Sequence, residues 1–188
     1  MKKYTFMQKE LIYLGFVIAK NELKMDPEKV AAIVNWPSPK NLFEVRSFHG
    51  LASFYWKFIK NFNEICAPML DTIKKANQPF RWTEAVERSF QLLKRKITER
   101  PIPRLPDFKN LFQVRCDANG TGNGAVLSQE DKPIAFFSEN LNESQLKYSS
   151  YDKEFYAIIH ALKHWRHYLL GNEFVLFSDN STLQYVMQ

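Results

Sequence analysis

Three carboxylates stand at positions where an ionised side chain is costly. Asp117 follows the apolar, strand-like run 112–116, and Asp179 follows a similar run at 174–177. Glu154 falls near the start of a long amphipathic helical pattern, on its apolar side. Acids that end two strands and begin a helix can converge at one edge of a sheet, where their oxygens could hold divalent metal ions. Because hard oxygen donors suit Mg²⁺ or Mn²⁺ better than zinc, the set predicts a magnesium or manganese site.

Each acid also has an ordinary structural interpretation. Asp117 could begin a loop, Glu154 could complement the dipole of a first helical turn, and Asp179 could cap a helix. At helical spacing, however, Glu154 shares one face with Ile158, Ala161 and Trp165. That face should pack on a sheet and turn Glu154 toward its edge. All three acids together, in strand–helix–strand order, favour the metal site.

The elements that must position these acids change character near residue 100. Before it, the pattern predicts strands at 11–18 and 23–25, then helices at 27–35, from 41, at 64–74 and from 83. After Pro101, Pro103 and Pro106, it predicts strands at 111–116, 123–128, 133–138 and 173–178, with helices at 151–169 and from Ser181. The predicted fold is α+β or α/β: a small β-hairpin and helical subdomain, followed by a mixed β-sheet domain.

The bulk composition excludes several classes of protein. In 188 residues, 45% are hydrophobic and 15% aromatic, which is enough for packed cores and argues against global disorder. No apolar run is long enough to span a membrane, and the N-terminus lacks the apolar stretch of a signal peptide. Cys66 and Cys116 have no metal-like spacing, so we expect reduced, mostly buried thiols in an intracellular protein of the cytoplasm or nucleus.

Charge divides the chain in the same place. Residues 1–110 hold 20 Lys and Arg against 11 Asp and Glu, whereas residues 111–188 hold 6 against 9. The basic half fits a role in holding phosphates, and the acidic half fits a role in holding metal. Basic helices are often only solvated surfaces, so the charge alone favours nucleic acid modestly.

Long motifs give the chain a family resemblance. In the first half these are residues 13–18 (YLGFVI), 25–30 (MDPEKV), 36–40 (WPSPK), 45–55 (VRSFHGLASFY) and 58–62 (FIKNF). In the second half they are residues 117–119 (DAN), 124–129 (GAVLSQ), 151–154 (YDKE) and 178–179 (SD). The chain resembles the reverse transcriptase–ribonuclease H part of a gypsy-class LTR retrotransposon Pol polyprotein, with plant elements nearest in character.

The resemblance implies a domain layout and an activity. Residues 1–100 would be the primer-grip hairpin and thumb helices, residues 101–110 a proline-rich linker, and residues 111–188 a ribonuclease H-like domain, C-terminally truncated. The parent activity would be hydrolysis of the RNA strand of an RNA–DNA hybrid with two Mg²⁺ (or Mn²⁺) ions. Asp117 would bridge both ions, while Glu154 and Asp179 would each complete one side.

The resemblance also implies a surface for the hybrid or another duplex. Its expected residues are Tyr13, Leu14, Gly15, Arg46, Lys57, Lys60 and Asn119. Backbone amides near 119–123 are candidates for contacts to the RNA 2′-hydroxyl groups. Lys74 and Lys75 extend the basic series on the thumb helices, which is interleaved with aromatic residues. We expect those aromatics to be mostly core and some of the basic residues to contact nucleic acid.

Departures from the family pattern leave alternatives open. No Asp-Asp pair for polymerisation occurs, and the fourth metal-site residue would lie beyond Gln188, so the chain could be inactive. Its partners would be the fingers and palm upstream, and further ribonuclease H and integrase segments downstream. A non-catalytic nucleic-acid-binding remnant and an assembly module are the alternatives. Trp56 stands where a basic residue is common and exchanges a possible phosphate contact for apolar surface.

Three histidines form a separate pattern on the predicted helix 151–169. His160, His164 and His167 are spaced for one helical face, as in some zinc sites. No cysteine lies near them in sequence, and a zinc site would need a further ligand. We favour partly exposed residues near a helix end, where positive charge is favourable.

Overall fold

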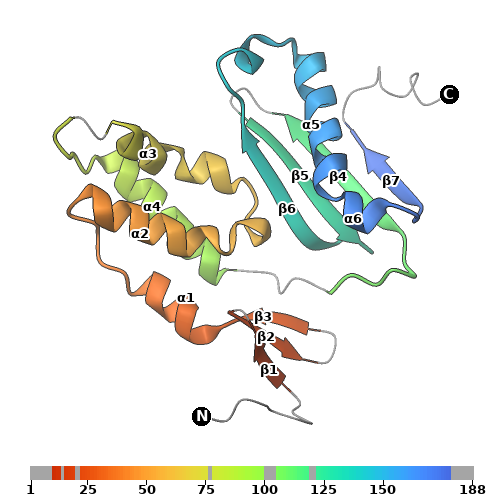
Figure 1. Ribbon diagram of the computed structural model, residues 1–188, viewed down its shortest axis with the longest axis horizontal. Coiled ribbons are helices and arrows are strands. Elements are labelled where there is room, and N and C mark those ends of the chain that lie inside the picture. Colours follow the sequence, from red (N-terminus) through yellow and green to blue (C-terminus); the bar gives the residue numbers. More distant parts are fainter. Residues whose placement is uncertain are drawn as a thin grey trace.

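The computed structural model describes residues 10–13, 15–19, 22–75, 78–99, 105–118 and 122–178 (Figure 1). The described elements form a small antiparallel sheet with four helices, followed by a four-stranded mixed sheet with its own helices. The predicted mixed fold class is confirmed. Among the described residues, no helix has the length and apolar character needed to cross a membrane.

The small sheet has three strands where a two-stranded hairpin was predicted. β1 (Glu10–Tyr13), β2 (Phe16–Ala19) and β3 (Glu22–Met25) pair antiparallel in chain order. The predicted strand 11–18 is strand at 11–13 and at 16–18, but it is not continuous because the chain reverses around Gly15, whose φ is +77°. Only glycine adopts this conformation without strain.

Four helices follow, each with a recognisable beginning. They are α1 (Pro27–Val34), α2 (Leu42–Ser53), α3 (Phe62–Lys74) and α4 (Glu84–Thr98). The side chains of Asp26, Asn41 and Thr83 cap α1, α2 and α4, and each accepts a hydrogen bond from a backbone N–H of the first helical turn. A 3₁₀ turn, η1 (Trp56–Phe58), separates α2 from α3. Helix α3 begins two residues before the predicted start at 64, after Asn61 in a left-handed conformation with φ 57°.

The core of the helical half is aromatic. The rings of Phe48 in α2 and Phe90 in α4 have centroids 4.5 Å apart, and both side chains are fully buried. The hydroxyl of Tyr55, also fully buried, donates a hydrogen bond of 3.1 Å to the carbonyl of Gly15. This bond fixes the small sheet on the helices.

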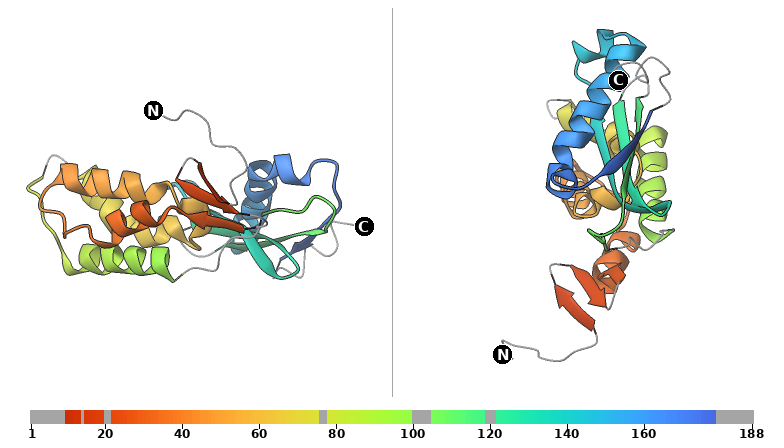
Figure 2. Two further views of the ribbon diagram at one scale, coloured as in Figure 1. Left: turned by 90° about the horizontal axis from the view of Figure 1, so that it is seen from below. Right: turned by 90° about the vertical axis from the view of Figure 1, so that its right-hand side faces the viewer.

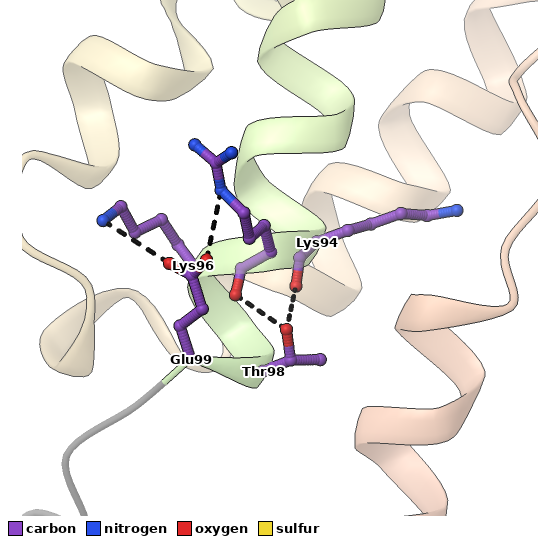
Figure 3. Close-up of polar contacts among 5 residues, drawn as sticks. Lys94, Lys96, Thr98 and Glu99 are labelled. Carbon is purple, nitrogen blue, oxygen red and sulfur yellow. Dashed lines mark hydrogen bonds and ion pairs between the residues drawn. The ribbon is translucent and has the colours of Figure 1, made fainter.

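The basic C-terminal end of α4 is compensated within the protein (Figure 3). Glu99 lies 3.3 Å from Arg95 and 3.9 Å from Lys96, while Thr98 Oγ1 donates to the Arg95 carbonyl at 2.8 Å. The ammonium of Lys94 donates to the carbonyl of Trp36. Lys94 thus supports helix packing, and Arg95 and Lys96 complement the dipole at the helix end.

The larger sheet has the order β6–β5–β4–β7. Its strands are β4 (Phe112–Ala118), β5 (Gly122–Gln129), β6 (Lys132–Asn140) and β7 (Phe174–Phe177). β4, β5 and β6 are antiparallel neighbours, and β7 joins β4 in parallel. A short 3₁₀ turn, η2 (Gln145–Lys147), leads from β6 to the helices of this half.

One face of the larger sheet is covered by α5 (Ser150–His164) and α6 (Arg166–Leu169) (Figures 1 and 2). The predicted single helix 151–169 is interrupted at Trp165, whose φ of −97° and ψ of 18° are not helical. Trp165 is 1% exposed because its ring packs into the core between helix and sheet.

Candidate active site

Asp117 lies near the C-terminal end of β4, where it pairs with Gly124 of β5. Its side chain is exposed. Strand alternation places it on the same face as Arg115, away from the core face formed by Phe112 and Val114. Asp117 also lines a groove of about 650 Å³, together with Lys60 of the helical half.

Glu154 lies in the first turns of α5, on the face that the sequence predicted. Ala157, Ile158 and Ala161 on that face are 1%, 5% and 0% exposed. Ser149 caps the helix by accepting a 3.1 Å hydrogen bond from the Asp152 N–H. Glu154 is half-buried, and its Oε2 is buried without a hydrogen-bond partner among the described residues. Its predicted inward orientation is confirmed.

The two acids lie at the same end of the sheet. Phe112, at the start of β4, contacts Tyr168 of α6 with ring centroids 6.1 Å apart, so the chain after α5 lies over the beginning of β4. Helix α5 therefore runs opposite to β4, and its first turns lie toward the strand end that carries Asp117 (Figure 1). A buried oxygen without a partner at this end suits a cation or an ordered water.

The third acid, Asp179, lies outside the described residues, as do Leu14 and Asn119. For Tyr13, only its backbone place in β1 is described. Among the described residues, no group of three His, Cys, Asp or Glu side chains is close enough to hold a metal ion. The described part of the protein thus contributes two acids, Asp117 and Glu154, which fit oxygen ligands of a Mg²⁺ or Mn²⁺ ion by their chemistry.

The sequence placed Asn123 only at the end of the range 119–123 whose backbone amides are candidate RNA contacts, and did not predict that its side chain is buried. It is 3% exposed, and neither side-chain amide atom has a hydrogen-bond partner among the described residues. It is the second residue of β5 and pairs with Ala118 of β4 and Glu139 of β6. A lone Asn between Gly122 and Gly124 resembles turn sequence, so no local signal predicts its burial.

The three histidines make separate contacts. His160 Nδ1 lies 2.8 Å from Glu139 Oε2, and the His160 ring stacks on Tyr156 at 3.9 Å. His164 packs between Phe137 at 5.0 Å and Trp56 at 5.4 Å. His167 follows the break at Trp165 and lies in α6. The predicted partial exposure holds, while the three rings have different partners rather than a common ligand.

The thumb-like helices separate aromatic core from basic surface, as predicted. Tyr55, Phe58 and Phe62 are 0%, 7% and 3% exposed. Arg46 and Lys60 are exposed, and neither has an ion-pair partner among the described residues.

Two of the other predicted lysines, Lys57 and Lys74, are more constrained. Lys57 lies over Phe16 at 5.3 Å and Phe58 at 5.0 Å, and burial lowers the pKa of its ammonium. Lys74 lies 3.6 Å from Asp71. Arg46 and Lys60 are therefore better placed than Lys57 and Lys74 to contact a phosphate backbone.

Both cysteines are free thiols, as predicted. Cys66 is buried and Cys116 is half-buried. Burial raises the pKa of each thiol to about 12, so neither is a reactive thiolate at neutral pH.

Comparison with known families decides the affiliation. Residues 82–176 match the family described as "RNase H-like domain found in reverse transcriptase". The chain belongs to this family. The matched range contains Asp117 and Glu154, the two acids that the fold brings to one end of the sheet.

Curated relatives of this RNase H-like chain are retrotransposon polyproteins. It is 40% identical to the retrovirus-related Pol polyprotein from transposon 297 and 37% identical to that from transposon gypsy, both of Drosophila melanogaster, over 99% of this chain. It is 33% identical to the transposon Tf2-3 polyprotein of Schizosaccharomyces pombe over 96% of the chain. The chain spans 18%, 19% and 14% of these relatives. They support the gypsy class, and they give no support to the predicted plant character.

Solved structures show the same fold. The foamy viral protease-reverse transcriptase in complex with RNA/DNA hybrid matches 98% of this chain with a TM-score of 0.86 and 24% identity, and the match spans 26% of that chain. The foamy viral protease-reverse transcriptase in complex with dsDNA matches 96% of the chain with a TM-score of 0.83. The likeness extends over both the helical half and the larger sheet.

Proposed function

We propose that this RNase H-like chain belongs to a gypsy-class retrotransposon enzyme that hydrolyses the RNA strand of an RNA–DNA hybrid. The observation that carries the proposal is the buried, unpartnered oxygen of Glu154, at the sheet end where Asp117 is exposed. Within the matched family, this pair of acids supports a hydrolytic site that needs divalent cations.

In this proposal Asp117, Glu154 and Asp179 hold Mg²⁺ or Mn²⁺, two ions in the intact site. The ions would supply an activated water and stabilise the charge of the leaving oxygen. Asp117 is exposed and would face the substrate, whereas Glu154 is held by the packing of α5. The buried side chains of Ala157, Ile158 and Ala161 hold the helix that carries Glu154 on the sheet. This packing limits the reorganisation that ligand binding requires.

The helical half would hold the duplex. Arg46 and Lys60 would contact phosphates, and Lys57 would add a partly desolvated cation. The primer-grip residues Tyr13, Leu14 and Gly15 and the loop residue Asn119 stay predicted nucleic-acid contacts. Titrating a hybrid into single alanine variants would test each one.

The wider context of the chain is part of the proposal. Residues 1–100 would act as primer grip and thumb, 101–110 as linker and 111–188 as the nuclease part. Polymerase fingers and palm upstream, and further ribonuclease H and integrase segments downstream, would be its partners in the polyprotein. We expect it to act inside the cell, in cytoplasm or nucleus. A nearer kinship to plant elements stays a prediction for comparison with individual plant element sequences.

Strand selectivity tests the proposed reaction. The chain is incubated with Mg²⁺ or Mn²⁺ and with an RNA–DNA hybrid, a DNA duplex or an RNA duplex, each strand labelled in turn. We expect cleavage of the RNA strand of the hybrid alone, and its loss on chelation of the metal. Equal cleavage of the DNA duplex, or cleavage that survives chelation, would contradict the proposal.

A binding-only role is the second candidate. It is favoured by Arg46 and Lys60, which are exposed without ion-pair partners among the described residues and need no metal to hold phosphates. It predicts salt-dependent hybrid binding with no metal-dependent cleavage. An assembly role instead predicts binding to a protein partner that survives high salt.

A further inference from the structure

Trp56 touches both halves of the protein. It begins η1 and packs against the core of the helical half. Its ring also meets His164 of α5 edge-on, with centroids 5.4 Å apart. His164 lies on Phe137 of β6 at 5.0 Å, and Phe137 lies against Trp165 at 6.4 Å. Trp56 thus reaches the aromatic layer that holds α5 on the sheet.

Asn63 makes a second connection, seven residues further along the chain. Its backbone N–H donates to Ser138 Oγ at 3.2 Å, and its side-chain Nδ2 donates to the Ser138 carbonyl at 2.7 Å. Ser138 of β6 pairs with Gly124 of β5, and Gly124 pairs with Asp117 of β4. The first turn of α3 is therefore tied to the cross-strand row that ends at Asp117.

A candidate phosphate-binding residue, Lys60, belongs to the same segment as these two connections. Lys60 lies between Trp56 and Asn63 in sequence, and it lines the same groove as Asp117. Figure 1 shows this part of the helical half beside β6. One short segment, residues 56–63, thus presents a cation to the groove and contacts the sheet that carries Asp117.

We propose that Trp56 and Asn63 are positioning residues that hold the larger sheet at one place relative to the duplex-binding helices. A hybrid bound on the helices is then cut at a fixed distance from its point of attachment. Trp56 acts through α5, which carries Glu154, and Asn63 acts through the row that ends at Asp117. We call the contacts of Trp56 with His164 and of Asn63 with Ser138 the joint between the two halves. The cutting distance rests on the proposed function, whereas the joint does not.

Solution scattering tests the joint without reference to cleavage. The full chain is compared with Trp56→Ala, Asn63→Ala and the double variant, with Phe43→Ala as a control because Phe43 is 77% exposed on α2. We expect the double variant to have a larger radius of gyration while keeping its circular dichroism. The single variant Trp56→Phe keeps an aromatic ring at this position and should therefore have the wild-type radius of gyration. An unchanged radius of gyration in the double variant would overturn the joint.

A map of cut positions tests the consequence. On an end-labelled hybrid, the wild type should cut within a narrow cluster, and the double variant should spread its cuts. Cleavage at the preferred position should fall by up to about 10²-fold because the geometry is lost. Hybrid affinity should stay within about twofold, since neither residue is a phosphate contact. An unchanged map with an expanded shape would overturn the positioning role, and absence of cleavage in the wild type would overturn the proposed function while scattering still decides the joint.

Discussion

The oxygen of Glu154 that has no partner among the described residues gives the site a readout besides activity. If the site holds Mg²⁺ or Mn²⁺, the ion should stabilise the folded wild type, by about 1.4 kcal/mol at a metal concentration tenfold above Kd. Glu154→Gln keeps the shape and removes the charge, so it should lose this stabilisation. Thermal unfolding with and without metal measures it. Equal stabilisation of wild type and Glu154→Gln would contradict a metal role for this residue.

Asn123 should be a source of instability. It is 3% exposed, and its amide has no hydrogen-bond partner among the described residues. Asn123→Val removes the unpaired amide and suits a strand, so we expect a gain of about 1–3 kcal/mol in the free energy of unfolding. Urea denaturation measures the gain. A loss of stability would mean that a bound water satisfies the amide in the cavity of about 10 Å³ beside it.

Glu154 and Asn123 differ in how far sequence could predict them. The environment of Glu154 follows from helical spacing to Ile158 and Ala161, which is local information. The environment of Asn123 depends on Ala118 and Glu139, which become its neighbours only through strand pairing. Sequence periodicity therefore located the acid and missed the amide.

Among the elements, the boundaries that carry local signals were predicted well. The caps Asp26, Asn41 and Thr83 fix three helix starts because each side chain bonds a free N–H. The reversal at Gly15 was missed because residues 11–18 are continuously apolar and hide a turn. The break at Trp165 was missed because the apolar spacing continues across it and gives no local signal for an interruption.

Two helices carry histidines that link stability to pH. Burial lowers the pKa of His49 in α2. The pKa of His164 in α5 is also lowered, mainly by burial and to a smaller extent by repulsion from the nearby His167. Since the unfolded chain then binds protons more readily, the free energy of unfolding should decrease as pH falls below about 6.5. The decrease should level off below the two folded-state pKa values.

Equilibrium unfolding between pH 7.5 and 5.5 measures this effect. The double variant His49→Gln/His164→Gln should show a flatter pH dependence than the wild type over this range. A wild-type stability that is constant or rises on acidification would contradict the assignment.

At the scale of the whole molecule, the relation between the two halves could not be predicted from sequence. It depends on contacts between Trp56 and His164 and between Asn63 and Ser138, which join distant parts of the chain. No local period encodes such pairs. The division near residue 100 was visible because charge and periodicity both change there.

The basic surface of the helical half should make hybrid binding salt-dependent. Each lost phosphate contact should reduce the slope of log K against log salt by about 1. We expect this reduction for Arg46→Gln and for Lys60→Gln, measured by fluorescence anisotropy over a salt series. Lys74→Gln is the matched control because Lys74 is equally cationic but paired with Asp71. The same slope in all three variants would contradict the assigned surface.

Metal-dependent cleavage by matched variants tests the central claim most directly. A labelled RNA–DNA hybrid is incubated with Mg²⁺ or Mn²⁺ and the wild type, Asp117→Asn or the control Asp71→Asn, an exposed acid on α3. The site predicts cleavage by the wild type and control, and a loss of at least about 10³-fold in Asp117→Asn with hybrid binding retained. No cleavage by any of them, or equal cleavage by all three, would contradict a hydrolytic site built on Asp117.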